Sequence, residues 1–202
     1  MKTVLSFSGG KDSCFALHQL QKENIDVACL LTTVWKVDKT TVAHSESLAK
    51  MKEQANSLQI PIYFMETDFN EYGTDFVNSL KEIKMMYRVD GIAFGDIYLQ
   101  GHREWGENIA AQAKLKPYYP LWSEKQHALS LLRSFVDLNF KAVVTKVDDT
   151  KLPADWVGRP LDATFITDIS HYDVCPMGES GEYHTFVQEG PIFSYPVHKR
   201  LP

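Results

Sequence analysis

The first half of the chain alternates between two kinds of hydrophobic pattern. Nearly continuous apolar runs rich in β-branched residues are typical of buried strands of a parallel sheet. The predicted strands are residues 3–7, 25–34, 60–65 and 89–94. Between them, apolar positions recur every three or four residues, which predicts amphipathic helices. The predicted helices are residues 14–20, 45–58, 70–86 and 102–114.

This alternation predicts an α/β fold, in which a twisted parallel sheet carries helices on both faces. The pattern changes at residues 117–122, PYYPLW, which indicate a rigid connection rather than a regular element. Beyond it, a helix is expected over residues 125–136 and a strand over residues 140–147. We therefore expect a domain of residues 1–116 followed by a smaller α+β domain of residues 117–202.

Composition narrows the class of protein. Of the 202 residues, 44% are hydrophobic and 23% are charged, as in an ordinary globular protein, and the formal net charge of -5 gives no general attraction to nucleic acid. No apolar run reaches the length of a membrane span, and residues 1–2 lead directly into a predicted strand, so neither a membrane segment nor a signal peptide is expected. The three cysteines form no pair by spacing, which suggests a reducing cytoplasm.

The most informative motif is residues 8–13, SGGKDS, between the first predicted strand and the first predicted helix. Adjacent glycines allow a tight turn and a close approach to a ligand, and the helix N-terminus favours an anion. The spacing differs from that of a Walker A loop. Because the Asp12 carboxylate would repel phosphate, a Mg²⁺ ion held by Asp12 is expected between them. The alternative is a plain glycine turn between a strand and a helix.

A second motif, residues 178–185, GESGEYHT, lies near the C-terminus. Glu179 and Glu182 are candidates to orient an amine nucleophile or to bind a second metal ion. The alternative is an ordinary polar turn before a short strand, and on these residues alone the turn is the commoner case.

Taken together and in this order, the two motifs resemble those of the diphthine–ammonia ligase family, and the likeness spans most of the chain. SGGKDS itself resembles the pyrophosphate (PP) loop of the N-type ATP pyrophosphatases. The resemblance implies an N-terminal domain of the adenine nucleotide α-hydrolase (HUP) type that binds ATP, and a C-terminal part that holds the acceptor. The implied enzyme is an ATP-dependent ligase, which adenylates a carboxylate, releases pyrophosphate and passes the acyl group to ammonia or an amine. In that family the acceptor lies on a translation elongation factor, and a small molecule is the other candidate acceptor for this chain. Whether the chain forms a homodimer is left open.

These predictions give a set of candidate site residues. The expected ATP contacts are Ser6, Ser8, Gly9, Gly10, Lys11, Asp12, Ser13, Thr32, Gly95 and Asp96. The expected catalytic residues are Lys11, Asp12, Glu179 and Glu182, and the expected substrate contacts are Arg103, Gly178, Gly181, Glu182 and Thr185. The sequence departs from the family at Asp96, which stands where a neutral residue is expected, so the acceptor can differ.

Two residues near these motifs keep alternative interpretations. Arg103 is a candidate for binding a carboxylate, or else forms an i,i+4 ion pair with Glu107. His44 is a candidate nucleotide contact, although a solvated loop histidine is the commoner case.

Two rival functions also remain. The first is a PP-loop enzyme that transfers sulfur to RNA, which needs catalytic cysteines or an iron–sulfur cluster and usually a basic surface. The three scattered cysteines and the net charge of -5 argue against this function. A nucleotide-binding sensor needs the first motif but has no use for the second.

Overall fold

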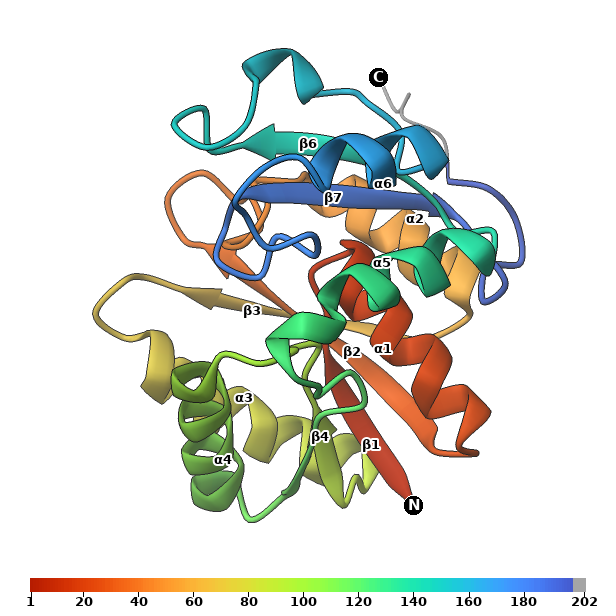
Figure 1. Cartoon of the computed structure of the whole chain (residues 1–202). Coiled ribbons are helices and arrows are strands. Elements are labelled where there is room, and N and C mark those ends of the chain that lie inside the picture. The colour runs from red at the N-terminus through yellow and green to blue at the C-terminus, as the bar shows by residue number, and fades with distance from the viewer. Residues whose placement is uncertain (198–202) are drawn as a thin grey trace.

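The computed structural model describes residues 1–197; the last five residues of the predicted second domain lie outside the described part. Its main sheet is parallel and five-stranded, with the order β3-β2-β1-β4-β5 (Figure 1). The strands are β1 (Lys2–Ser6), β2 (Asp26–Trp35), β3 (Ile62–Thr67), β4 (Gly91–Ala93) and β5 (Lys116–Tyr118). The expected α/β fold is confirmed.

Helices cover both faces of this sheet. The helices are α1 (Lys11–Lys22), α2 (Leu48–Leu58), α3 (Tyr72–Tyr87) and α4 (Gln100–Ala113). The buried faces of α1 and α2 pack on one side of the sheet and those of α3 and α4 on the other, so the strands lie between two apolar cores. Among residues 1–197, no helix has both the length and the apolar character that crossing a membrane requires.

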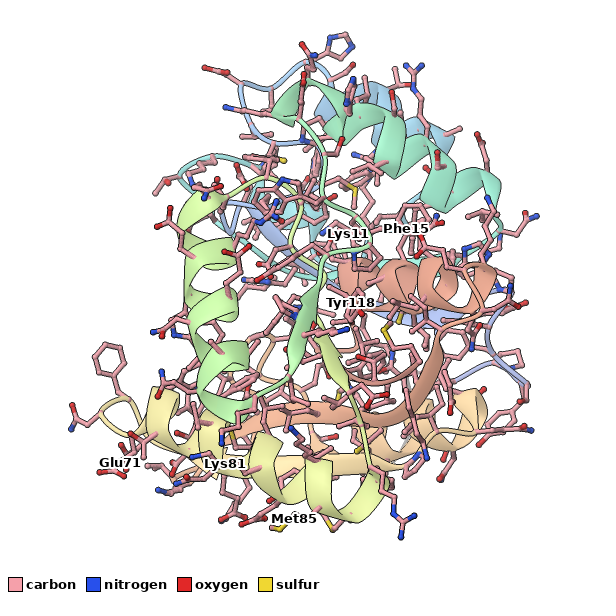
Figure 2. The ribbon with its side chains drawn as sticks, turned by 90° about the horizontal axis from the view of Figure 1, so that it is seen from below. Lys11, Phe15, Glu71, Lys81, Met85 and Tyr118 are labelled. Atoms are coloured by element: carbon pink, nitrogen blue, oxygen red, sulfur yellow. The ribbon has the colours of Figure 1, made fainter. Side chains whose placement is uncertain are left out.

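A smaller unit follows in the chain and packs on the outer side of α1. Its strands β6 (Lys141–Val147) and β7 (Tyr183–Glu189) pair in antiparallel fashion, and its helices are α5 (Ala128–Asp137) and α6 (Ala163–Ile169). Phe15 of α1 meets Phe135 and Phe140 of this unit, with ring centroids 6.1 and 6.5 Å apart. Figure 2 shows Phe15 and Lys11 in the interior of the molecule. Helix α1 is therefore shared by the two halves.

Strand β5 corrects the expectation that residues 117–122 contain no regular element. Pro117 has no N–H to donate, which disfavours a strand in general. Here the strand is the last in the sheet order, so Pro117 lies at an edge, where the missing donor is tolerated. The bonds from Lys116 N–H to the Asp90 carbonyl and from Phe94 N–H to the Tyr118 carbonyl hold it in register.

Helix α2 begins later than predicted, at Leu48, after the N-cap residue Ser47. The residues before it form a loop instead, in which Ser45 has a left-handed φ of 54°. Isolated bridges from Val34 to Thr41 and from Thr40 to Ser47 hold this loop over the end of β2. The loop consequently reaches the functional site described below.

The strand order places a switch point between β1 and β4, since the chain leaves these two neighbouring strands in opposite directions across the sheet. In open parallel sheets, ligands bind outside the carboxyl ends of the strands at such a point. Residues 8–13 follow β1 and Gly95–Asp96 follow β4. A Cβ atom on Gly95 would lie 3.1 Å from the Asp12 carbonyl carbon, so glycine lets the two segments meet.

Candidate active site

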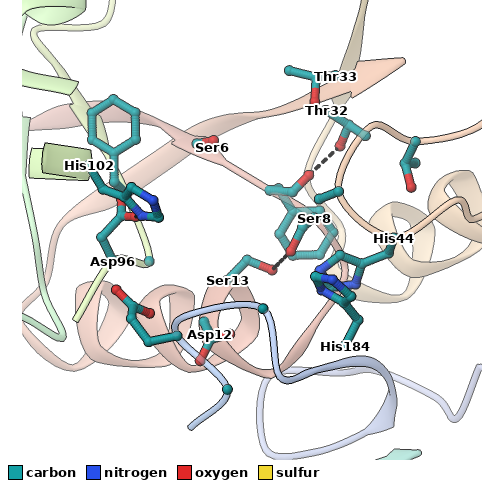
Figure 3. Close-up of a pocket in the computed structure, with 18 of the residues that line it drawn as sticks. Ser6, Ser8, Asp12, Ser13, Thr32, Thr33, His44, Asp96, His102 and His184 are labelled. Atoms are coloured by element: carbon teal, nitrogen blue, oxygen red, sulfur yellow. Dashed lines mark hydrogen bonds and ion pairs between the residues drawn. The ribbon is translucent and has the colours of Figure 1, made fainter. Parts of the chain in front are cut away.

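A cavity of about 520 Å³ lies at the carboxyl ends of the parallel strands (Figure 3). Asp12 and Ser13 of the first motif line it together with Glu179 and Ser180 of the second. The two motifs therefore face one cleft. The predicted site residues that line the cavity are Ser6, Ser8, Asp12, Ser13, Thr32, Gly95, Asp96, Gly178, Glu179 and Gly181. Those that do not line it are Gly9, Gly10, Lys11, Arg103, Glu182 and Thr185.

The first motif forms the turn that leads into α1. Within residues 1–197, the backbone N–H groups of Asp12 and Ser13 have no acceptor, whereas the Lys11 N–H donates to Thr185 Oγ1 at 3.0 Å. The Ser13 hydroxyl donates to the Gly10 carbonyl at 3.0 Å and lies 3.3 Å from the Ser8 hydroxyl at the cavity wall. Free amides at a helix N-terminus, flanked by hydroxyl donors, form an arrangement suited to phosphate oxygens.

Asp12 and Lys11 form an ion pair in this turn, with 3.0 Å between Lys11 Nζ and Asp12 Oδ2. Burial raises the pKa of Asp12, and the neighbouring Lys11 ammonium partly offsets that effect. The other carboxylate oxygen, Asp12 Oδ1, is buried without a partner. Lys11 lies 4.6 Å from the centre of the Tyr183 ring, beneath the turn, so it supports Asp12 instead of lining the cavity as the sequence predicted.

The two glutamates of the second motif have different surroundings. Glu179 lines the cavity, and its Oε1 accepts the Ile97 N–H at 2.8 Å. Burial, followed by the charges of Asp12 and Asp96, raises the pKa of Glu179 to about 7. Glu182 is 5% exposed and does not line the cavity. The sequence predicts a catalytic role for Glu182, but both of its carboxylate oxygens accept backbone amides instead of facing the cavity.

Hydrogen bonds explain this position of Glu182. Its Oε1 accepts the Cys175 N–H at 3.1 Å, and its Oε2 accepts the Ser180 N–H at 2.9 Å. An ionised carboxylate that accepts two amides fixes a loop well. Glu182 therefore shapes the loop that presents Glu179.

Two further residues hold the first motif in place: Gln54, which the sequence analysis does not nominate, and His44, which it leaves as a candidate nucleotide contact. Gln54 of α2 donates from Nε2 to the carbonyls of Gly9, at 2.9 Å, and Val187, at 2.7 Å, and so ties the loop to β7. A usable signal existed, since this polar residue falls on the apolar face of α2. His44 lines the cavity rather than lying in solvent.

The environment of His44 fixes its protonation state. Its Nδ1 lies 2.9 Å from the Thr185 carbonyl, which can only accept, so Nδ1 carries the proton. Burial, with the His184 ring at a centroid distance of 4.9 Å, lowers the pKa of His44 to about 3. A Cβ atom on Gly10 would lie 2.4 Å from His44 Cε1. His44 therefore packs directly on Gly10 and leaves no room for a side chain at that position.

Comparison with known proteins places the chain in a family. The family model for the diphthamide synthase N-terminal domain matches residues 1–117, and the model for the C-terminal domain of the same synthase matches residues 127–200. The chain belongs to the diphthamide synthase family. The two matched regions include both motifs that wall the cavity.

Curated relatives in this family carry the name diphthine–ammonia ligase. The Danio rerio protein is 29% identical and the Homo sapiens and Bos taurus proteins are each 26% identical, in every case over 96% of this chain. The chain covers 84% of the first and 80% of each of the other two. These names confirm the expectation of an enzyme of the ligase class.

The remaining candidates lie away from the cavity. Arg103 does not line it: its Nε donates to Glu107 Oε1 at 2.8 Å, and its guanidinium stacks 4.8 Å from the Trp122 ring centre. Its position four residues before Glu107 on one helix face accounts for this ion pair. The cysteines Cys14, Cys29 and Cys175 are all buried, and none lines the cavity. Burial raises the pKa of Cys14 and Cys29, which keeps those thiols protonated.

Proposed function

We propose that this protein is an ATP-dependent ligase that converts a carboxylate of its acceptor into an amide. The supporting observation is one shared cavity in which a loop suited to phosphate faces the Glu179 carboxylate of a second loop. The names of the family's curated relatives support the same class of reaction. On this proposal residues 1–116 bind ATP, and residues 117–202 contribute the acceptor side.

In the first step, an oxygen of the acceptor carboxylate attacks the α-phosphorus of ATP. The bond between that phosphorus and the α–β bridging oxygen breaks, so pyrophosphate leaves and an acyl adenylate remains. The free N–H groups of Asp12 and Ser13 and the hydroxyls of Ser8 and Ser13 are suited to hold the phosphates during this exchange.

In the second step, ammonia or an amine attacks the acyl carbon, AMP leaves, and the nitrogen loses a proton. Glu179 lines the cavity and is placed to orient the attacking nitrogen by accepting one of its N–H groups. The enclosing second loop would keep water from the acyl adenylate.

Mg²⁺ would neutralise phosphate charge in this cavity. The fit rests on Asp12, whose Oδ1 is buried and unpartnered and whose oxygen chemistry suits this ion. Without a cation between them, the Asp12 carboxylate and a polyphosphate would repel each other.

The test uses an acceptor with ¹⁸O in its carboxylate, together with ATP, Mg²⁺ and ammonium. The acceptors to try are a translation elongation factor carrying the unamidated precursor and a fractionated pool of small carboxylic acids. The proposal expects AMP and pyrophosphate as products, one ¹⁸O atom in the AMP, and an amide on the acceptor by mass spectrometry. ADP and phosphate as products, or AMP without the label, would contradict it. Nucleotide binding without turnover across these acceptors would favour a sensor.

A further inference from the structure

Three side chains of metal-ligand type meet at one end of the cavity. They are Asp96, which follows β4, His102 in the first turn of α4, and Glu179 of the second motif. One ligand atom from each lies within 4.8 Å of the others. Figure 3 shows Asp96 and His102 together, at the opposite end of the cavity from His44.

The geometry of these groups suits a shared ion. His102 Nδ1 and Asp96 Oδ1 form a hydrogen bond of 3.0 Å, which already holds the two ligand atoms at a spacing close to that around one cation. The Ile97 N–H bond to Glu179 Oε1 fixes the third carboxylate and leaves its other oxygen available. Such an outer hydrogen bond is what orients ligands in metal sites.

The charge in this region supports the same conclusion independently. Asp12, Asp96 and Glu179 all line the cavity. Within residues 1–197, Asp12 pairs with Lys11 and Asp96 with His102, whereas Glu179 has no ion-pair partner, and the other oxygen of Asp12 is buried and unpartnered. Carboxylates gathered in a partly desolvated cavity repel one another unless a cation lies between them.

We propose that Asp96, His102 and Glu179 bind a divalent cation in the absence of nucleotide, at a site separate from the Mg²⁺ expected at Asp12. Two carboxylates and one imidazole suit Mn²⁺ or Fe²⁺ better than Ca²⁺, whose ligands are oxygens. Three protein ligands leave coordination positions free for a substrate oxygen.

This site would bind the acceptor carboxylate, an inference that rests on the proposed function. An anionic acceptor is repelled by the acidic end of the cavity unless a cation offsets that charge. Glu179, the only ligand of the three from the C-terminal unit, would then link acceptor binding to the ATP-binding half. Cation binding itself needs neither ATP nor the acceptor, so its test stands apart from the test of ligase activity.

The experiment titrates the whole protein with Mn²⁺, without nucleotide, and follows bound ion by electron paramagnetic resonance. We expect one bound Mn²⁺ per chain, with a nitrogen coupling from His102 in the pulsed spectrum. His102→Gln should remove the nitrogen coupling, and Glu179→Gln, which can still accept the Ile97 N–H, should weaken binding at least about tenfold. His171→Gln, at an exposed histidine elsewhere, is the matched control and should change neither property. Circular dichroism establishes that each variant is folded.

Three results would overturn the proposal. Folded wild-type protein could bind no Mn²⁺ at millimolar concentration. The nitrogen coupling could persist in His102→Gln. Asp12→Asn could abolish binding while Glu179→Gln leaves it unchanged, which would place the ion at the first motif instead.

Discussion

The two loops that wall the cavity use their polar groups differently. The first loop, residues 8–13, presents backbone amides and hydroxyls to the cavity, and its lysine lies beneath it. The second loop, residues 178–185, presents a carboxylate, Glu179, while an equally acidic neighbour, Glu182, is bonded to backbone amides. One loop is built to receive an anion, and the other supplies negative charge opposite it. On the proposed function, the first loop would hold the phosphates of ATP and the carboxylate of the second loop would orient the attacking nitrogen.

Asp12→Asn should have the largest effect on this arrangement. The amide keeps the shape of the loop but loses the charge that pairs with Lys11 and with a metal ion. We expect turnover to fall at least about 100-fold and ATP affinity to fall much less. Steady-state pyrophosphate release measures turnover and calorimetry measures ATP affinity, both corrected for the folded fraction. An equal loss of both would argue against a metal role for Asp12.

Gly10→Ala tests how tightly the first loop is packed. The new Cβ would lie 2.4 Å from His44 Cε1 and 3.1 Å from the Thr185 carbonyl oxygen, so one segment must move. We expect a loss of about 1–3 kcal/mol in the free energy of unfolding, together with weaker ATP binding. Gly101→Ala is the control: nothing lies within 4 Å of its added Cβ in α4, so it should stabilise by up to about 1 kcal/mol. Equal effects of the two changes on urea unfolding would contradict this account.

The paired substitutions Glu182→Gln and Glu179→Gln separate the two carboxylates of the second loop. Glutamine at 182 can accept only one of the two amides that Glu182 accepts, so stability should fall by about 1–3 kcal/mol. Glutamine at 179 retains its bond to Ile97, so stability should be maintained, while amide formation, the step assigned to Glu179, is lost. Thermal unfolding and mass spectrometry of the amide product on both variants check this. The reverse pattern would make Glu182 the reacting group.

His44 should make the protein less stable in acid. Its pKa is lowered from 6.5 to about 3 in the folded protein, so between these values the unfolded chain binds more protons. The free energy of unfolding must then fall as the pH drops through this window, by at most about 1.4 kcal/mol per pH unit for one proton. The nearby His184, whose pKa burial also lowers, acts in the same direction.

His44→Asn isolates the contribution of His44, since an amide N–H can replace Nδ1–H as donor to the Thr185 carbonyl. Urea unfolding at several pH values should show a shallower acid loss in this variant. An unchanged slope would mean that His44 does not govern it.

The sequence predicted much of this fold because its strands are buried on both faces and its helices have one apolar face. Strand β5 escaped prediction because Pro117 signals a break and only its place at the sheet edge makes a strand acceptable. Both loops could be located from glycines and polar residues in a strand–turn–helix or turn–strand context. Which of Glu179 and Glu182 faces the cavity depends on loop hydrogen bonds that spacing does not encode. Gln54 and His44 act through contacts with Gly9, Val187 and Thr185, which are distant in the sequence.

The most direct test of the central claim is a crystal structure with an ATP analogue that has a methylene group between the α and β phosphates. The account predicts phosphate oxygens against the N–H groups of Asp12 and Ser13, and the Glu179 carboxylate in the same cavity. A triphosphate bound outside this cavity, or one that reaches it only after the second loop has moved away, would contradict the account.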